Sequence, residues 1–457
     1  MHVRNPYTDT IIQTIDDHQH DDVDARIAGA YAGRDAFRQM PAHERASILT
    51  RTASLIAERS QAFAESIVQE SAKPMRYARG EVNRCVETFT FAADVARHLN
   101  GETLQMSAAK GGVGRVGYYM REAVGVVGAI TPFNFPLNLV AHKVAPALAV
   151  GCPIVLKPSP MTPLTALKLA ETLREAGLPD GLFSVLIGDV AVGEQLTTDP
   201  RIAMISFTGS PGVAQAISKV AGLRRTTFEL GGNAATVIDE GTALTDALIG
   251  RIAVGSFAYS GQVCISVQRL YVHDSLYDAF RERLIAHTQA LTLGDPMDDA
   301  TEIGPLINDA ATERLAAWLT AASEQGAQIS AGGHFDGRMM HPTILEDVRD
   351  DMQVMCAEAF GPLVNLVRYD DFDTVLAEVN DSDFGLQAGV YTPSLAKAMQ
   401  AIETLNVGGV IINDVPTFRV DHMPYGGNKQ SGVGREGPRF AIEDMTTLKM
   451  VVINPTP

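Results

Sequence analysis

The sequence is poor in cysteine and has no cysteine pattern typical of a metal site or a disulfide framework. Its 457 residues include only 4 cysteines. No C-x-x-C or H-x-x-x-H spacing is present, so we predict no metal site. So few cysteines in so long a chain are typical of a reducing compartment. The cysteines are Cys85, Cys152, Cys264 and Cys356.

The sequence also lacks long apolar runs and an excess of basic residues. The longest apolar stretch, 144–156, is broken by prolines and is too short to span a bilayer. The N-terminus lacks the apolar core of a signal peptide, so we expect a cytoplasmic protein with no membrane contact. Lys and Arg number 37 against 54 Asp and Glu, which gives a net charge of −17. This charge argues against a nucleic-acid partner, but one or two local arginines could still bind a small anion.

The hydrophobic pattern predicts an α/β fold. Residues 22–99 have apolar side chains at helical spacing, and from residue 124 short apolar strands alternate with helices. This alternation is typical of βαβ units and a parallel sheet. The expected strands are 124–130, 154–156, 183–187, 203–207 and 226–230, and the expected helices lie near 137–149, 163–176, 190–198 and 212–222.

A second α/β unit and a small projecting sheet are expected after residue 232. The alternation resumes with strands at 236–238, 270–272, 388–391 and 410–412 and helices at 243–259, 275–289, 308–324 and 394–405. A strand at 448–453 beside the region 100–122 would form a projecting sheet suited to oligomerisation. We therefore predict a cofactor domain (1–102 and 123–230), a catalytic domain (231–430) and an oligomerisation element (103–122 and 431–457).

The predicted strands of the first sheet end in polar, glycine-bearing segments. Ligands of parallel sheets bind at the carboxyl ends of the strands, so these segments predict a ligand-binding rim. Ser210, after Gly209, could donate to a phosphate from a helix N-terminus, or could simply cap that helix. Lys157 ends a buried strand and could meet a ligand hydroxyl or phosphate, or an internal carboxylate. The rim segments are 131–134, 157–159, 188–189, 208–210 and 229–232.

Three further side chains could carry chemistry. Cys264 lies among small and polar residues in Ser260–Ser266, where a thiol could act as a nucleophile or be an ordinary buried cysteine. Glu229 ends a strand and could work as a general base, or could form a structural hydrogen bond. Asn134 could face an oxyanion, or could be a turn residue beside Pro136. Together, a thiol nucleophile, a base and an oxyanion donor beside a rim large enough for a dinucleotide are the groups needed for attack on an aldehyde and loss of a hydride.

Through these motifs, the chain resembles the aldehyde dehydrogenase superfamily. The matching segments occur in family order and cover essentially the whole chain. They are Thr131–Pro136, Leu156–Ser159, Phe207–Ser210, Phe228–Asn233, Gly261–Cys264, Glu358–Pro362, Pro424–Gly427 and Ser431–Glu436. The resemblance implies a Rossmann-like cofactor domain, a catalytic α/β domain and a small β oligomerisation element, assembled as a homodimer or homotetramer.

The resemblance also implies roles for individual residues. Cys264 would be the nucleophile, Glu229 the base for the deacylating water, and Asn134 with the Cys264 N–H the oxyanion hole. NAD or NADP would be the cofactor, since Pro160 stands where NAD-preferring members often carry Glu. Lys157 and Glu358 would hold ribose hydroxyls, Ser210 the pyrophosphate and Phe360 the nicotinamide. The full predicted cofactor set is Thr131, Pro132, Phe133, Lys157, Ser159, Gly188, Gly209, Ser210, Leu230, Glu358 and Phe360.

The expected substrate is a small polar aldehyde. Residues 265–269 and 413–424 resemble the branch that oxidises lactaldehyde, glycolaldehyde, semialdehydes, phosphonoacetaldehyde and sulfoacetaldehyde. Arg419 and His142 are candidate substrate contacts, although Arg419 could equally form a structural ion pair. Val263 stands where phosphonate-specific relatives carry Arg, which favours a hydroxyaldehyde or a monoanionic semialdehyde. The alternatives are a phosphono- or sulfoaldehyde dehydrogenase, a CoA-acylating enzyme, and a non-catalytic protein on the same fold.

Overall fold

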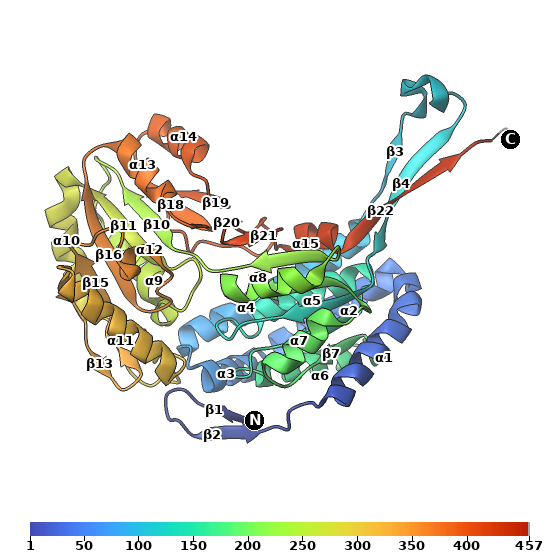
Figure 1. Ribbon diagram of the computed structural model, residues 1–457, viewed down its shortest axis with the longest axis horizontal. Helices are drawn as coiled ribbons and strands as arrows, with labels where there is room; N and C mark the ends of the chain where they lie inside the picture. The colour runs from blue at the N-terminus through green and yellow to red at the C-terminus, as the bar shows by residue number, and fades with distance from the viewer. Residues whose placement is uncertain (456–457) are drawn as a thin grey trace.

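The computed structural model describes residues 1–455 and shows two α/β units with a narrow sheet projecting from one of them (Figure 1). The first unit carries the N-terminal helices and a six-stranded sheet, and the second carries a seven-stranded sheet. The predicted α/β class, with a Rossmann-like unit, a second α/β unit and a small β element, is confirmed. In the described residues, no helix is long and apolar enough to cross a membrane.

The first sheet has the strand order β21-β9-β8-β5-β6-β7. Strands β5 to β9 run parallel, and β21 is antiparallel to β9. The chain order reverses between β5 and β8, which is where parallel sheets of this kind bind their ligands. The strands are β5 (Val126–Ile130), β6 (Ile154–Lys157), β7 (Phe183–Val185), β8 (Ile202–Thr208), β9 (Arg225–Glu229) and β21 (Gly432–Val433).

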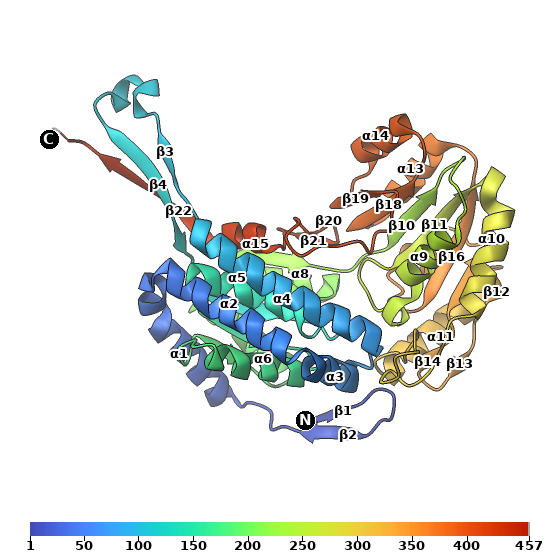
Figure 2. The ribbon, with the colours of Figure 1, turned by 180° about the vertical axis from the view of Figure 1, so that it is seen from behind.

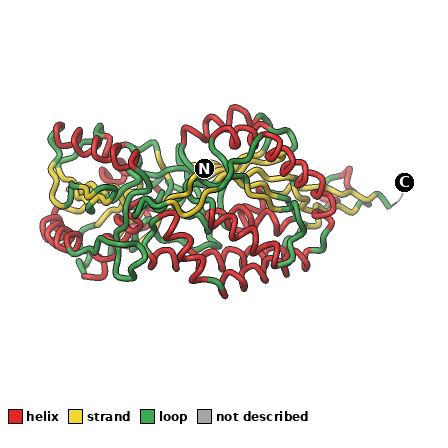
Figure 3. Tube along the Cα trace, turned by 90° about the horizontal axis from the view of Figure 1, so that it is seen from below, coloured by secondary structure: helices red, strands yellow, loops and turns green. Residues whose placement is uncertain are grey.

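Helices cover both faces of the first sheet (Figures 2 and 3). Every residue of α5 is buried, because this helix lies between the sheet and α2, α4 and α15. One face is covered by α2 (Ala42–Glu58), α3 (Ser60–Ser71), α4 (Met75–His98), α5 (Asn138–Val150), α6 (Leu164–Glu175) and α15 (Pro438–Asp444), and the other by α1 (His20–Gln39), α7 (Val190–Thr198) and α8 (Pro211–Ala221).

The second sheet has the order β12-β15-β16-β11-β10-β18-β19. Helices α9 (Asp246–Phe257) and α10 (Asp274–Gln289) share one apolar core with it, while α13 (Phe372–Asn380) and α14 (Leu395–Thr404) share another. Helices α11 (Asp309–Glu324) and α12 (Gln353–Cys356) pack near its β12 edge. The strands are β10 (Ala234–Ile238), β11 (Val267–His273), β12 (Gln328–Ala331), β15 (Thr343–Glu346), β16 (Leu363–Tyr369), β18 (Gln387–Tyr391) and β19 (Gly409–Ile412).

The projecting sheet consists of β3 (Glu102–Leu104), β4 (Val116–Ala123) and β22 (Thr446–Ile453), in the order β22-β4-β3. It exposes apolar side chains such as Leu104, Val116, Leu448 and Val452. This exposure supports the predicted homo-oligomer, which stays a prediction. The residues just before β22 are not part of this projecting sheet. They belong to the first unit, where β21 pairs with β9 and α15 packs on α5.

Several elements were not anticipated from the sequence pattern, among them β12, β15 and β16 of the second sheet and the helix α13. The hairpin of β1 (His2–Arg4) and β2 (Ile11–Thr14) joins the two units, because Arg338 donates to the Pro6 carbonyl and pairs with Asp9. The other short pairs are β13 (Phe335–Asp336) with β14 (Met339–Met340), and β17 (Phe384–Gly385) with β20 (Asn428–Lys429). These two-residue pairs link loops to each other and add no strand to the two main sheets.

Candidate active site

A strained loop between α9 and β11 presents Cys264. Tyr259, Ser260 and Gly261 have φ values of 50°, 54° and 65°, in the left-handed region that side chains rarely adopt. A Cβ on Gly261 would lie 2.0 Å from the Gly361 carbonyl oxygen, so glycine is required there. Tertiary contacts stabilise the loop, including the bond from Ser260 Oγ to the Gly304 carbonyl. The thiol is thus placed by a local conformation that the rest of the fold enforces.

Asn134 lies directly beside this loop. It follows β5 and is 3% exposed, and its Nδ2 donates to the Gln262 carbonyl at 3.0 Å. An amide nitrogen has two hydrogens, so one remains for another acceptor. Within residues 1–455, Asn134 Oδ1 has no hydrogen-bond partner and the Cys264 N–H makes no backbone bond. The structure therefore brings together the two donors that the sequence predicted for an oxyanion hole.

Glu229 ends β9 and is 2% exposed. Neither carboxylate oxygen has a hydrogen-bond partner in the described part of the chain. Burial and the nearby Glu436 carboxylate raise the pKa of Glu229 well above its ordinary value. A structural glutamate would have its oxygens hydrogen-bonded. Across the described residues, Glu229 forms no such structural hydrogen bond, and both of its oxygens are free for another partner.

The segment Tyr425–Gly426 connects these groups. The Tyr425 hydroxyl lies 3.0 Å from Cys264 Sγ, and a Cβ on Gly426 would lie 2.7 Å from Glu229 Oε1. Burial raises the pKa of the Cys264 thiol to about 12, and the Tyr425 hydrogen bond acts in the opposite direction. The glycine motif marked this segment in the sequence, but no sequence signal placed the hydroxyl on the thiol.

Arg419 covers the other side of Tyr425. Its guanidinium carbon lies 3.6 Å from the centre of the Tyr425 ring, and it pairs with Glu436 at 3.1 Å. Glu436 also pairs with Lys143 at 3.1 Å. Over residues 1–455, Arg419 Nε has no hydrogen-bond partner although it is buried. The predicted Arg419 therefore forms an ion pair and also retains a donor beside the thiol site.

The predicted His142 lies behind Arg419 and is 1% exposed. Its Nε2 is 2.8 Å from Asp421 Oδ1 and 3.1 Å from Arg419 Nη2. Burial and the Arg419 charge lower the pKa of His142, so a neutral ring donates from Nε2 to Asp421. Asp421 is also held by Arg84 through two hydrogen bonds of 3.0 and 2.8 Å. Arg84, Lys143, Asp421 and Glu436 were missed from the sequence, because their partners are distant along the chain.

A groove of about 590 Å³ lies at the carboxyl ends of β5 and β6. Lys157 and Pro160 line it on one side, together with the carboxylates of Asp189 and Glu194. Burial lowers the pKa of Lys157. Apart from Thr197 and Thr198, the rest of the wall is glycine or apolar side chains and suits the flat face of an adenine. Its apolar lining is Ile130, Val190, Val213, Ala216, Ile217 and Val220.

The other predicted cofactor residues lie along the same rim. Thr131 is buried and its Oγ1 has no partner among the described residues. Gly209 packs so closely on Phe207 that a Cβ would lie 2.5 Å from the ring. Ser210 is exposed at the N-terminus of α8 and makes no capping bond. Pro132 and Phe133 continue the loop after β5, Ser159 follows β6, Gly188 precedes α7, and Leu230 follows β9.

Glu358 and Phe360 reach the rim from the second unit. Glu358 Oε1 accepts from the Gly232 N–H at 3.0 Å, and burial raises its pKa to about 7. The rings of Phe360 and Phe133 meet edge to face with centres 5.8 Å apart. An orphaned threonine hydroxyl, a free helix N-terminus, a buried lysine and an apolar slot together fit a dinucleotide between the two units.

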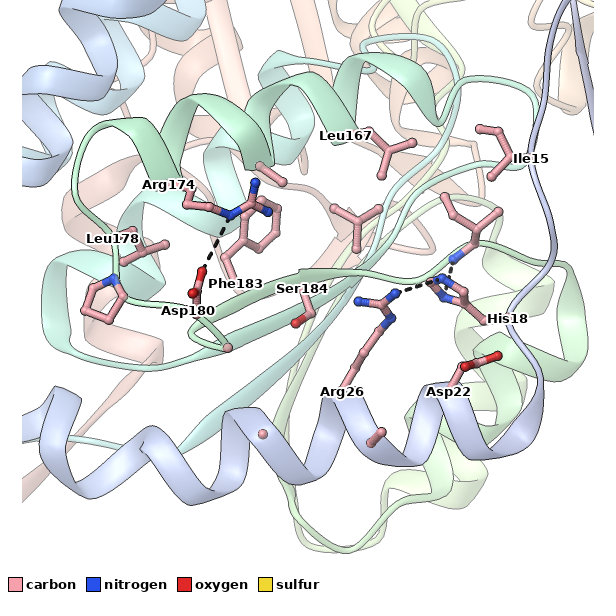
Figure 4. Close-up of a pocket in the computed structure, with 17 residues that line it drawn as sticks. Ile15, His18, Asp22, Arg26, Leu167, Arg174, Leu178, Asp180, Phe183 and Ser184 are labelled. Carbon is pink, nitrogen blue, oxygen red and sulfur yellow. Dashed lines mark hydrogen bonds and ion pairs between the residues drawn. The ribbon is translucent and has the colours of Figure 1, made fainter.

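A second groove, of about 560 Å³, lies along the edge strand β7 between α1 and α6 (Figure 4). Its charged side chains engage one another: Arg174 pairs with Asp180 at 3.5 Å, and Arg26 Nη2 lies 3.1 Å from His18 Nε2. No predicted site residue lines this groove. We assign it no part in the chemistry.

Fold and site together define a class of protein: an α/β enzyme with a dinucleotide-binding rim facing a cysteine. Comparisons with known proteins agree. The model of the Aldehyde dehydrogenase family matches residues 1–451, and the chain belongs to this family. It is 46% identical over 456 residues to the 3-sulfolactaldehyde dehydrogenase of Priestia aryabhattai, covering 99% of this chain and 95% of that protein.

Two solved structures are similar over nearly their whole length. Aldehyde dehydrogenase 21 of Physcomitrella patens, in complex with its reaction product succinate, is 39% identical with a TM-score of 0.98, covering 100% of this chain and 95% of that one. Glyceraldehyde-3-phosphate dehydrogenase of Methanocaldococcus jannaschii, complexed with NADP, is 35% identical with a TM-score of 0.95 and 99% coverage of both. The predictions of an aldehyde dehydrogenase and of NAD or NADP as its cofactor are confirmed at the level of the family.

Proposed function

We propose that this enzyme oxidises a small, monoanionic 2-hydroxyaldehyde to the carboxylic acid with NAD(P)⁺, and that 3-sulfolactaldehyde represents the substrate class. The observation that carries the proposal is the convergence on one thiol of Tyr425, Arg419 and Asn134, with Glu229 unpartnered nearby. The proposal combines the two substrate classes favoured from the sequence, because such a molecule has both the hydroxyl group and a single negative charge.

The chain's own groups account for the steps. Cys264 sulfur forms a bond to the aldehyde carbon while the carbonyl electron pair moves to oxygen, and Asn134 Nδ2 and the Cys264 N–H donate to that oxygen. Thr131, Lys157, Ser210 and Glu358 would hold NAD(P)⁺ along the rim, where it would supply the acceptor for the hydride lost by the same carbon. Glu229 then takes a proton from the water that attacks the thioester, and Cys264 leaves as the thiolate. A base positioned in this way favours hydrolysis over transfer to CoA.

The charges around the thiol support a monoanionic substrate. Arg84, Lys143 and Arg419 face two carboxylates, Asp421 and Glu436, and burial raises the pKa of Glu229, which disfavours its charged form. The cluster thus has an excess of positive charge that one anionic group would balance. We propose Arg419 as the direct contact, through its free Nε, and His142 as the residue that supports it. A planar guanidinium suits a sulfonate or a carboxylate.

The rim supports both dinucleotides. Pro160 cannot bind an adenosine ribose and places no carboxylate against a 2′-phosphate, and Lys157 lines the same groove. We therefore propose that the enzyme accepts NADP as well as NAD.

The test is a kinetic comparison of matched aldehydes with both cofactors. We expect 3-sulfolactaldehyde to have a higher kcat/KM than lactaldehyde, which lacks the charge. In Arg419→Met the ratio of the two kcat/KM values should fall by about ten- to hundredfold, the usual effect of losing a charge-assisted hydrogen bond. Taking the ratio within one variant cancels any general loss of folded enzyme.

An unchanged ratio in Arg419→Met would contradict the substrate assignment without touching the reaction class. Free acid formed without CoA would distinguish hydrolysis from CoA acylation. A lack of NAD(P)H formation with every aldehyde, together with a thiol unreactive to iodoacetamide, would instead support a non-catalytic protein.

A further inference from the structure

The Tyr425 hydroxyl has one hydrogen-bond partner in the described chain, the sulfur of Cys264 at 3.0 Å. Tyr425 is 3% exposed and packs against Ile265 and Leu386. Its backbone is fixed by an antiparallel bridge in which Tyr425 and Glu436 exchange hydrogen bonds of 3.1 and 2.6 Å. The phenol is therefore held against the thiol by packing on one side and by main chain on the other.

The chemistry of the two groups determines the direction of this hydrogen bond. Burial and the neighbouring thiol raise the pKa of Tyr425 well above its ordinary value, so the phenol keeps its proton. A thiolate can only accept, so once Cys264 is ionised the hydroxyl is the donor. The Arg419 guanidinium lies 3.6 Å from the ring centre. A cation at that position draws electron density toward the ring face and makes the O–H a stronger donor.

We propose that the Tyr425 hydroxyl is a catalytic hydrogen-bond donor to the Cys264 thiolate. This inference rests on the proposed role of Cys264 as the nucleophile. The hydroxyl stabilises the thiolate before attack, loses its acceptor when the sulfur lone pair forms the S–C bond, and regains it when thioester hydrolysis releases the sulfur as an anion. Tyr425 keeps its proton throughout, so no proton or electron needs another donor.

Four groups influence the thiol, and their effects can be separated. Burial is the largest effect and raises the pKa of Cys264; Tyr425 and Arg419 lower it, whereas Glu358 and Glu229 raise it. Among these groups, Tyr425 makes the hydrogen bond to sulfur that the structure shows. Removing its oxygen therefore changes the thiolate directly and leaves the charges of the site in place.

The experiment is the pH dependence of iodoacetamide alkylation in Tyr425→Phe, measured on the full-length enzyme without aldehyde or cofactor. Losing a hydrogen bond to a charged group should reduce the thiolate fraction below the thiol pKa by about ten- to hundredfold. A less stabilised thiolate is intrinsically more nucleophilic, with a Brønsted slope of about 0.4–0.5. The expected net result at pH 8 is alkylation of Cys264 that is about three- to tenfold slower.

Two controls keep the result specific. Cys356 is exposed, and its alkylation, followed by peptide mass spectrometry in the same sample, should be unchanged. Tyr277→Phe removes a different phenol, one bonded to Glu346 at 2.9 Å, and should leave Cys264 alkylation within about twofold of the wild-type rate.

Wild-type alkylation of Cys264 in Tyr425→Phe would overturn the proposal. If that variant fails to fold, Tyr425→3-fluorotyrosine retains the hydroxyl, strengthens it as a donor, and should increase the thiolate fraction. An unchanged thiolate titration in that enzyme would also overturn the proposal. Full dehydrogenase turnover in Cys264→Ser would instead refute the nucleophile assignment and hence the proposed function.

Discussion

Two buried polar clusters in this molecule differ in how fully their hydrogen bonds are satisfied. In the first, Glu81 accepts from Lys73 and from the N–H groups of Leu137 and Asn138, which begin α5. Lys73 also lies 3.7 Å from the centre of the Phe135 ring. In the second, around Cys264, Glu229 has no hydrogen-bond partner within residues 1–455.

This difference separates scaffold from site. A buried polar group without a partner costs about 1–3 kcal/mol, so an unpartnered carboxyl group beside a thiol marks a place where a ligand could be bound. The Lys73–Glu81 cluster uses its charges to fix a helix terminus. The Cys264 cluster leaves a carboxyl group and an amide N–H free to engage a substrate, a developing oxyanion or a water molecule.

The largest effect on activity is expected when the thiol of the Cys264 cluster is removed. Cys264→Ala should reduce aldehyde oxidation to background, because no other group in the site can form the covalent intermediate. Binding of NADP, followed by fluorescence quenching, should remain measurable. Substantial turnover in this variant would mean that the reaction does not pass through Cys264.

The next largest effect is expected at the unpartnered carboxyl. Glu229→Gln should slow thioester hydrolysis by about 10²–10⁴-fold, the usual contribution of a general base, and leave a burst of NAD(P)H in stopped-flow traces. In the wild type, the hydrolysis rate should rise with pH as Glu229 loses its proton, since its pKa is raised. A glutamine at 229 that preserves both the rate and its pH dependence would assign the base elsewhere.

A somewhat smaller effect is expected at the free amide. Asn134→Ala removes one oxyanion donor and should lower kcat by about 10²–10³-fold. The loss should appear in the first turnover as well as in the steady state, because the oxyanion forms during attack. A burst of normal rate would show that Asn134 instead serves to hold the Gln262 carbonyl.

The scaffold cluster should respond in the opposite way. Lys73→Met leaves the buried Glu81 carboxylate without its cation, and should lower the free energy of unfolding by about 3–5 kcal/mol. The kcat of the folded enzyme should stay within about twofold of wild type, because Lys73 contacts none of Cys264, Glu229 and Asn134 and meets the loop of Cys264 only at the Tyr259 ring, 4.7 Å from its Nζ. Urea unfolding and active-site titration give the two quantities, and a large loss of kcat at normal stability would erase the distinction between the clusters.

Much of this organisation could be read from the sequence. The alternation of short apolar strands with helices identified the parallel strands of the first sheet and β10, β11, β18 and β19 of the second, because strands buried on both faces need continuous apolar runs. It missed β12, β15 and β16 of the second sheet. Cys264, Glu229, Asn134 and Lys157 became candidates from their places in loops and at strand ends, and the resemblance to the family supplied the roles predicted for them. Short elements such as β1 and β13 were missed, because few residues carry too little periodicity.

The tertiary structure alone decided which side chains meet. Tyr425 is 161 residues from the thiol it touches, and Asp421 is 279 residues from His142. Spacing along the chain holds no information about such contacts, since they depend on how two separate sheets and their loops pack. The sequence by itself determined the α/β class and the strand ends, which follow from local pattern, whereas the role predicted for Cys264 came from the resemblance to the family. The hydroxyl on the sulfur and the excess of positive charge around it arise only when distant segments are brought together.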